Sequence, residues 1–135
     1  MNKKKKGSDA EREVIHLLWK HDWAALRVAG SGSSRYPSPD IIAGNALRRI
    51  AIECKITKEK IKYFPKEEIE SLQMFSTKFG AEPWIAIKFP KKEWLFVSLD
   101  DLESTGKMCG INQETAEKKG LLLKEVLERR SEKSF

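Results

Sequence analysis

The chain has 135 residues, a usual size for one compact domain, and no Pro/Gly/Ser-rich linker divides it. Its net charge of +6 leaves two interpretations open, a polyanionic partner such as nucleic acid or a slightly basic soluble protein. Two cysteines without a CxxC pair argue against a disulfide framework or thiolate zinc site, and no signal peptide or apolar run of about 18 residues is present, so we expect a cytoplasmic protein.

The first predicted element is a helix over residues 8–21. Ser8 and Glu11 match the S-x-x-E capping box, in which two side chains satisfy backbone N–H groups at a helix start. A broad apolar face follows, formed by Val14, Ile15, Leu17 and Leu18. The lysine-rich residues 1–7 are expected to form a flexible basic tail.

Three strands are predicted next, at 25–29, 40–44 and 47–56, with a Gly- and Ser-rich loop over 30–38. The remaining elements are, in order, a basic irregular segment over 58–66, a helix over 66–79 that ends at Gly80, strands over 83–89 and 94–99, a loop over 104–113 and a helix over 121–130. This order, αβββαββα, predicts an α/β fold with a mixed central sheet flanked by helices.

Acidic side chains and one lysine gather on the second and third predicted strands. The period of two places Glu53 and Lys55 on the same face of their strand. A two-residue turn at Asn45 and Ala46 would put Asp40 opposite Ala51 and diagonal to Glu53, near enough to share a hard cation. A turn of another length could reverse this register.

These groups suit metal-dependent phosphodiester hydrolysis. One or two divalent ions held by carboxylates would screen the phosphate and lower the pKa of a bound water. All-oxygen ligands favour Mg²⁺, with Mn²⁺ as an expected substitute. Lys55 could orient or deprotonate that water or stabilise phosphate charge. The alternative is a salt-bridged strand face, and Glu11, which points to the buried side of its helix, could serve only as a cap.

The chain resembles the archaeal Holliday-junction resolvases of the restriction-endonuclease-like PD-(D/E)XK superfamily. The matching stretches run in the expected order and are KGSDAEREV (6–14), AGSGSSR (29–35), PDIIAG (39–44), IECK (52–55) and FSTKFG (75–80). The resemblance covers nearly the whole chain and implies one nuclease domain over 1–135. NQETAEKKG (112–120) departs from the family pattern, which leaves the role of the last helix open.

The resemblance also implies roles for single residues. Glu11, Asp40 and Glu53 would bind metal, and Lys55 would be the catalytic lysine. The family's functional arginines fall on Arg12 and Arg27, and its active-site serine falls within 31–33, where we favour Ser31. Family members are homodimers, and the phenylalanines near their interface map to Phe75 and Phe79. Packing against the sheet is the alternative for each aromatic ring, and Phe79 is the better interface candidate.

Basic and aromatic residues supply candidate DNA contacts. They are Arg27, Arg35, Lys58, Lys60, Lys62, Tyr63, Phe64 and Lys66, with Lys3 to Lys6 as a further candidate. In the 58–66 segment, Tyr63 and Phe64 could stack on an unpaired base, or the segment could be a plain basic loop.

The sequence therefore predicts a homodimeric endonuclease that makes paired Mg²⁺-dependent incisions in four-way DNA junctions by direct attack of water. Two alternatives are a nuclease of the same superfamily that acts on duplex, flap or RNA substrates, and a non-catalytic protein that binds branched DNA.

Overall fold

The computed structural model describes residues 3–30 and 35–129. Its elements in chain order are α1 (Lys3–Lys20), β1 (Ala24–Arg27), β2 (Ile41–Gly44), β3 (Arg49–Ile56), β4 (Ile61–Pro65), α2 (Lys66–Phe79), β5 (Glu82–Lys88), β6 (Leu95–Val97), the short 3₁₀ helix η2 (Leu99–Asp101), β7 (Glu103–Thr105), β8 (Met108–Asn112), α3 (Gln113–Lys119) and α4 (Leu123–Glu128).

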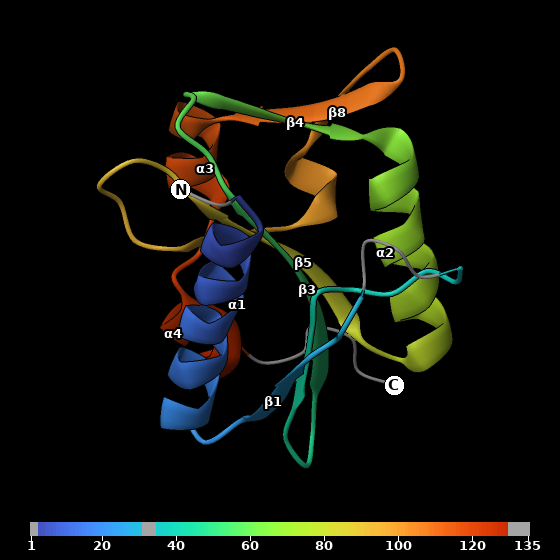
Figure 1. The fold of residues 1–135 in the computed structure, drawn as a ribbon, viewed down its shortest axis with the longest axis vertical. Helices are drawn as coiled ribbons and strands as arrows, with labels where there is room; N and C mark the ends of the chain where they lie inside the picture. Colours follow the sequence, from blue (N-terminus) through green and yellow to red (C-terminus); the bar gives the residue numbers. More distant parts are fainter. Residues whose placement is uncertain (1–2, 31–34, 130–135) are drawn as a thin grey trace.

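The central sheet is mixed and has the strand order β1-β2-β3-β5-β6. β3 and β5 are parallel, and the other neighbours are antiparallel. The parallel pair follows from the connection through α2, because parallel neighbours need a long crossover. A second, antiparallel sheet with the order β4-β8-β7 crosses one end of the molecule (Figure 1). The predicted mixed sheet flanked by helices is confirmed.

Each face of the central sheet is covered by its own hydrophobic core. α1 and α4 lie on one side of the sheet and α2 on the other (Figure 1). Val14, Leu18 and Val126 of α1 and α4 pack against Ile50 and Ile52 of β3. On the opposite face of the central sheet, Leu72 of α2 packs against both sheets. The core there contains Ala51, Ile85, Ile87 and Val97 of the central sheet and Phe64 and Ile111 of the second sheet. The alternation predicted for β3 is thus confirmed.

The N-terminal prediction is wrong about where the first helix begins. α1 starts at Lys3, so 3–7 is helical rather than a flexible tail, and Ser8 lies inside the helix rather than at its cap. The side chain of Ser8 instead accepts a hydrogen bond from Nη2 of Arg27 at 3.1 Å. Ser8 and Glu11 therefore form no capping box.

The turn between β2 and β3 is longer than predicted. Gly44 pairs with Arg49, so four residues separate the strands instead of two. Asn45 closes the turn, since its Oδ1 accepts hydrogen bonds from the backbone N–H groups of Leu47 and Arg48 at 2.8 and 2.7 Å. Two extra residues shift the register by an even number, which keeps every side chain on its expected face.

The second sheet arises where irregular structure was predicted. Residues 61–65 form β4 and pair with β8, in the region predicted as the 104–113 loop. Phe64 is fully buried in the core, so the prediction that it contacts DNA is wrong, and its neighbour Tyr63 faces outward. Helix α3 was not predicted; its N-cap Asn112 accepts a hydrogen bond from the Thr115 N–H at 2.7 Å.

The two remaining predicted helices are confirmed. α2 spans Lys66–Phe79 and ends at Gly80, whose φ of 84° is the left-handed conformation that favours glycine. α4 falls inside the predicted 121–130 range. Cys54 and Cys109 are both free. Within the described ranges, no helix has the length and apolarity needed to cross a bilayer.

Candidate functional site

Asp40 is held by backbone hydrogen bonds on both sides. Its N–H donates to the carbonyl of Ile52 at 3.0 Å, and its carbonyl accepts from the N–H of Val28 at 2.8 Å. The register Ile41↔Ile52, continued by one residue, sets Asp40 opposite Glu53 rather than opposite Ala51. The carboxylate of Asp40 also accepts a hydrogen bond from the N–H of Cys54 at 2.9 Å. The two acidic side chains therefore share one face of adjacent strands.

A cavity of about 600 Å³ opens beside these two strands. The predicted residues Asp40, Glu53 and Lys55 all line it, together with Arg35, Tyr36, Pro37, Ser38, Glu68, Ser71 and Leu72. The wall opposite the strands comes from the first turns of α2. Three of the four principal site residues predicted from the sequence thus meet in one cavity, and Arg35 joins them.

Lys55 forms an ion pair with a residue that the sequence analysis did not select. Its Nζ lies 2.8 Å from Oε1 of Glu68 and 3.9 Å from Oε2 of Glu53. The closer contact has the distance of a charge-assisted hydrogen bond without its angular alignment. Glu68 could have been found from helical periodicity, because it precedes the buried Leu72 by four residues and so shares its face.

The carboxyl groups of the cavity are electrostatically unequal. Burial raises the pKa of Glu53, and the hydrogen bond with Glu68 and the charge of Asp40 raise it further. Burial acts to raise the pKa of Glu68 as well, but its interactions with Glu53 and Lys55 outweigh burial and lower it. Glu53 therefore holds a proton more tightly than an ordinary glutamate, and Glu68 gives one up more readily.

Lys55 remains an ammonium group in this setting. Burial acts to lower its pKa, but the contact with Glu68 and the charges of Glu53 and Asp40 outweigh that effect, so the pKa is raised. A lysine with a raised pKa donates hydrogen bonds and positive charge, and is a poor acceptor of a proton at neutral pH.

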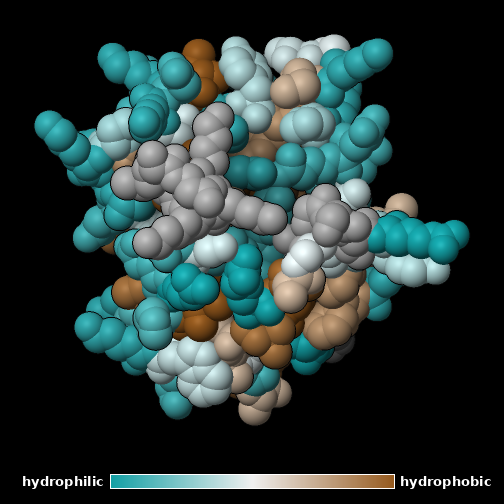
Figure 2. Space-filling view, viewed as in Figure 1, coloured by the Kyte–Doolittle hydropathy of each residue, from teal (hydrophilic) through white to brown (hydrophobic). Residues whose placement is uncertain are grey.

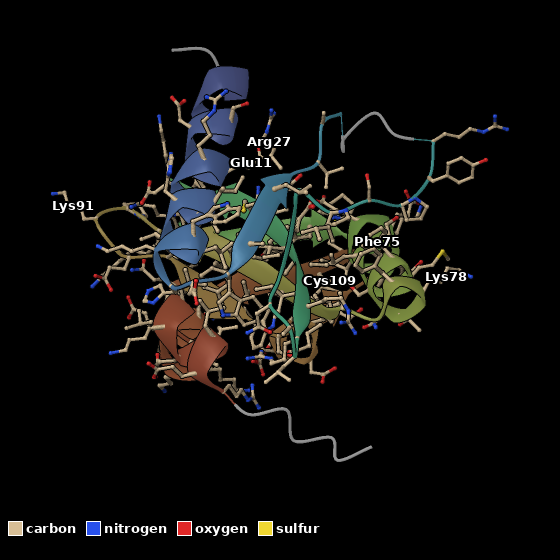
Figure 3. The ribbon with its side chains drawn as sticks, turned by 90° about the horizontal axis from the view of Figure 1, so that it is seen from below. Glu11, Arg27, Phe75, Lys78, Lys91 and Cys109 are labelled. Carbon is tan, nitrogen blue, oxygen red and sulfur yellow. The ribbon has the colours of Figure 1, made fainter. Side chains whose placement is uncertain are left out.

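Glu11 reaches the site region from the other side of the sheet. It lies on α1, does not line the cavity, and pairs with Arg27 at the end of β1, where Arg27 Nε is 3.4 Å from Glu11 Oε1 (Figure 3). Burial and the charge of Asp40 raise the pKa of Glu11, and Arg27 partly offsets them. Glu11 is thus close enough to Asp40 to interact with its charge.

The three predicted metal-binding carboxylates do not converge into a preformed cluster. Among residues 3–30 and 35–129, no group of three or more His, Cys, Asp or Glu side chains is arranged to hold a metal ion. Asp40 and Glu53 lie together in the cavity, and Glu11 stands beside them with its carboxylate turned to Arg27. The sequence pattern could not anticipate this separation, because Glu11 belongs to a different layer of the fold.

Most of the other predicted site residues do not line the cavity. Arg12 is exposed and pairs with Asp9 at 3.2 Å. Ser31 lies outside the described residues. Lys58 and Lys60 are exposed. Lys62, the second residue of β4, and Lys66, the first residue of α2, are half-buried. Tyr36, an exposed aromatic residue at the cavity, was not selected from the sequence.

Phe75 and Phe79 stack on each other along α2, with ring centroids 5.2 Å apart and an interplanar angle of 17°. Phe75, labelled beside α2 in Figure 3, is half-buried against the core beneath that helix, whereas 48% of Phe79 is exposed. The exposure of Phe79 agrees with the preference for it as an interface candidate, but no partner chain tests that prediction.

Comparison with known proteins places this chain in a family. The family model described as archaeal Holliday junction resolvase (Hjc) matches residues 2–135. A crossover junction endodeoxyribonuclease Hjc from Archaeoglobus fulgidus is 46% identical over 110 residues, which cover 82% of this chain and 81% of that protein. The Hjc of Methanocaldococcus jannaschii is 41% identical over 112 residues, which cover 83% and 80%.

A solved structure shares the fold. The structure of Archaeoglobus fulgidus Hjc, described as a Holliday junction resolvase from an archaeal hyperthermophile, superimposes with a TM-score of 0.82 and 44% sequence identity. The match covers 87% of this chain and 94% of that one. By its fold and its sequence, this chain belongs to the archaeal Holliday junction resolvase family.

Proposed function

We propose that this chain is a crossover junction endodeoxyribonuclease, which hydrolyses phosphodiester bonds at four-way DNA junctions with Mg²⁺ as its cofactor. The observation that carries the proposal is the cavity in which Asp40, Glu53 and Lys55 meet, in a chain of this family. Two relatives that are 46% and 41% identical to it over the aligned residues are named for that activity.

The donor set fits Mg²⁺. Asp40 and Glu53 offer carboxylate oxygens on adjacent strands, and Mg²⁺ needs only one or two protein carboxylates when waters and a phosphate complete its shell. Burial, Glu68 and the charge of Asp40 raise the pKa of Glu53, and a bound cation would lower it again. Binding should therefore displace the proton of Glu53. Glu11 is proposed as the third carboxylate of the site.

When bound, Mg²⁺ would offset the charge of the scissile phosphate and polarise the attacking water. Asp40, fixed by three hydrogen bonds to neighbouring strands, would hold the ion in register with the sheet. The ammonium of Lys55 would donate to the phosphate or orient the water, because its raised pKa makes it a poor base. Water attacks directly, and no covalent intermediate with the protein forms.

DNA binding is proposed to follow the cationic residues around the cavity. Arg35 lines it, while Lys58, Lys60, Lys62 and Lys66 lie on β4 or beside it. Tyr63 is half exposed on the outer face of β4 and remains a candidate for stacking on a base. The net charge of +6 agrees with a polyanionic substrate and predicts that binding weakens as salt rises.

A homodimer is proposed because two symmetric nicks require two sites at a fixed separation. On the face drawn in Figure 2, hydrophilic residues dominate the upper half and hydrophobic ones gather in the lower centre. α2 exposes Met74 by 51% and Phe79 by 48%, which provides apolar surface for a second copy.

The test is cleavage of a labelled four-way junction beside a linear duplex of the same sequence, with and without Mg²⁺. We expect Mg²⁺-dependent incision at symmetric positions of the junction and little cleavage of the duplex. Glu53→Gln should abolish cleavage and still bind the junction. Equal rates on both substrates would refute junction selectivity, and no cleavage with Mg²⁺ would refute the nuclease function.

A further inference from the structure

The ammonium of Lys55 lies between two carboxyl groups, and the nearer one does not belong to the acidic strand motif. Oε1 of Glu68 is 2.8 Å from Lys55 Nζ, against 3.9 Å for Oε2 of Glu53. Oε1 of Glu68 is also shielded from solvent. A shielded ion pair is less weakened by water and salt than an exposed one, so this contact dominates the position of the ammonium.

The fold holds Glu68 firmly at this place. It is the third residue of α2, where a negative charge also interacts favourably with the N-terminal end of the helix dipole. Leu72, one turn later on the same face, is buried in the core against β5 and the second sheet. Glu68 therefore approaches Lys55 from a rigid element on the far wall of the cavity.

The position of Lys55 matters because Glu53 would otherwise be its natural partner. The two residues are two positions apart on β3 and project from the same face. An ammonium group that paired with the carboxylate of Glu53 would compete with a cation for the same oxygens. A second carboxylate on the opposite wall draws the ammonium away from Glu53 and keeps it inside the cavity.

We propose that Glu68 is a positioning residue for Lys55, which holds the ammonium at the cavity wall and leaves the carboxylate of Glu53 available to Mg²⁺. The proposal rests on the nuclease function proposed above. Glu68 acts through Lys55 and touches neither metal nor substrate in this role.

The chain offers a matched control in the neighbouring residue. Glu67 carries the same charge in the same first turn of α2, but it is exposed and does not line the cavity. Glu67→Gln and Glu68→Gln each remove one negative charge from that turn, with the same effect on net charge and on the helix dipole. A difference between the two variants therefore reports the contacts that Glu68 makes in the cavity, with Lys55 and with Glu53, and the ammonium signal of Lys55 isolates the first of them.

The first measurement is single-turnover cleavage of a four-way junction as a function of Mg²⁺ concentration. Glu68→Gln should reduce the rate at saturating Mg²⁺ by about 10- to 100-fold, the usual effect of losing a group that orients a metal-site residue. It should also raise the Mg²⁺ concentration needed for half the maximal rate, while junction affinity stays unchanged. Glu68→Asp, which keeps the charge, should recover part of the rate, and Glu67→Gln should match the wild type.

The second measurement needs no metal and no cleavage. The side-chain ammonium signal of Lys55 in a ¹⁵N-correlated NMR spectrum of the metal-free protein, assigned by its loss in Lys55→Arg, reports how firmly the group is held. Glu68→Gln should shift or broaden this signal, and Glu67→Gln should leave it in place. If the wild-type protein fails to cut junctions, the proposed function is refuted while this spectrum still tests the contact.

Two results would overturn the proposal. One is an ammonium signal that is the same in Glu68→Gln and Glu67→Gln, which would show that Glu68 does not hold the lysine. The other is equal cleavage and equal Mg²⁺ dependence in these two variants, which would show that the contact does not serve catalysis. If Glu68→Gln fails to fold, Glu68→Asp, which retains the charge, identifies that failure and keeps it apart from the two results above.

Discussion

Arg48 ties the C-terminal helix to the central sheet, and its removal gives a sharp test of the packing described above. Its guanidinium forms a two-pronged ion pair with Glu82, with both N···O distances 2.8 Å. The same group donates to the backbone carbonyls at the end of α4, those of Val126, Leu127 and Arg129, at 2.9, 3.3 and 2.8 Å. It also lies 5.4 Å from the ring centroid of Trp23.

The magnitude follows from these contacts. The side chain of Arg48 is 11% exposed, so its bonds are largely shielded, and a hydrogen bond to a charged group contributes about 1.5–3 kcal/mol. When Arg48 is truncated, water can bind the carboxylate of Glu82, which is 39% exposed, and the carbonyls of α4. The lost hydrogen bonds of Arg48 are therefore partly replaced by hydrogen bonds to water. We expect Arg48→Ala to reduce the free energy of unfolding by about 2–4 kcal/mol, or to lower Tm by about 10 °C.

The assay is urea unfolding followed by circular dichroism, with Arg49→Ala as the control. Arg49 is the adjacent arginine, is exposed, and makes a single 3.3 Å hydrogen bond to the carbonyl of Gly80, so its loss should change the free energy by less than about 1 kcal/mol. Equal effects of the two substitutions would refute the assignment of Arg48 as the clamp on α4.

Three further predictions concern the site and its surroundings. Because the pKa of Glu53 is raised in the folded protein, its contribution to the stability of the metal-free wild type should be fully present below the ordinary pKa of glutamate and be lost as pH rises through the raised value; melts of Glu53→Gln should show a weaker loss toward alkaline pH, and an identical pH dependence would contradict the burial of that carboxyl group. Phe64→Ala should cost about 3–5 kcal/mol in urea unfolding and Tyr63→Ala less than about 1 kcal/mol, since only Phe64 is in the core; similar costs would contradict the register of β4. Phe79→Glu should shift sedimentation toward monomer, whereas Lys78→Glu should leave sedimentation unchanged, and a persistent Phe79→Glu dimer would exclude this end of α2 from the interface.

Local patterns in the sequence determined several elements correctly. The alternation on β3 sorted Ile50 and Ile52 from Glu53 and Lys55, because a strand turns successive side chains to opposite faces whatever it pairs with. Both ends of α2 were predicted at the right residues. The C-terminal end was predictable because glycine at 80 adopts the left-handed conformation that ends a helix at little cost. Glu53 and Lys55 were selected for the same alternation, and Asp40 was added through the expected hairpin between its strand and β3.

Contacts between distant segments were decided only by the tertiary structure. Residues 61–65 become a strand because 108–112 lie alongside to accept their hydrogen bonds, and a partner so far along the chain leaves no local signal in the sequence. Glu11 is set apart from Asp40 and Glu53 because α1 covers the opposite face of the sheet, and its carboxylate is drawn to Arg27. Glu68 enters the cavity because α2 packs its buried face over β3 and β5. The sequence by itself determined which side chains share a face, and tertiary packing decided which faces meet.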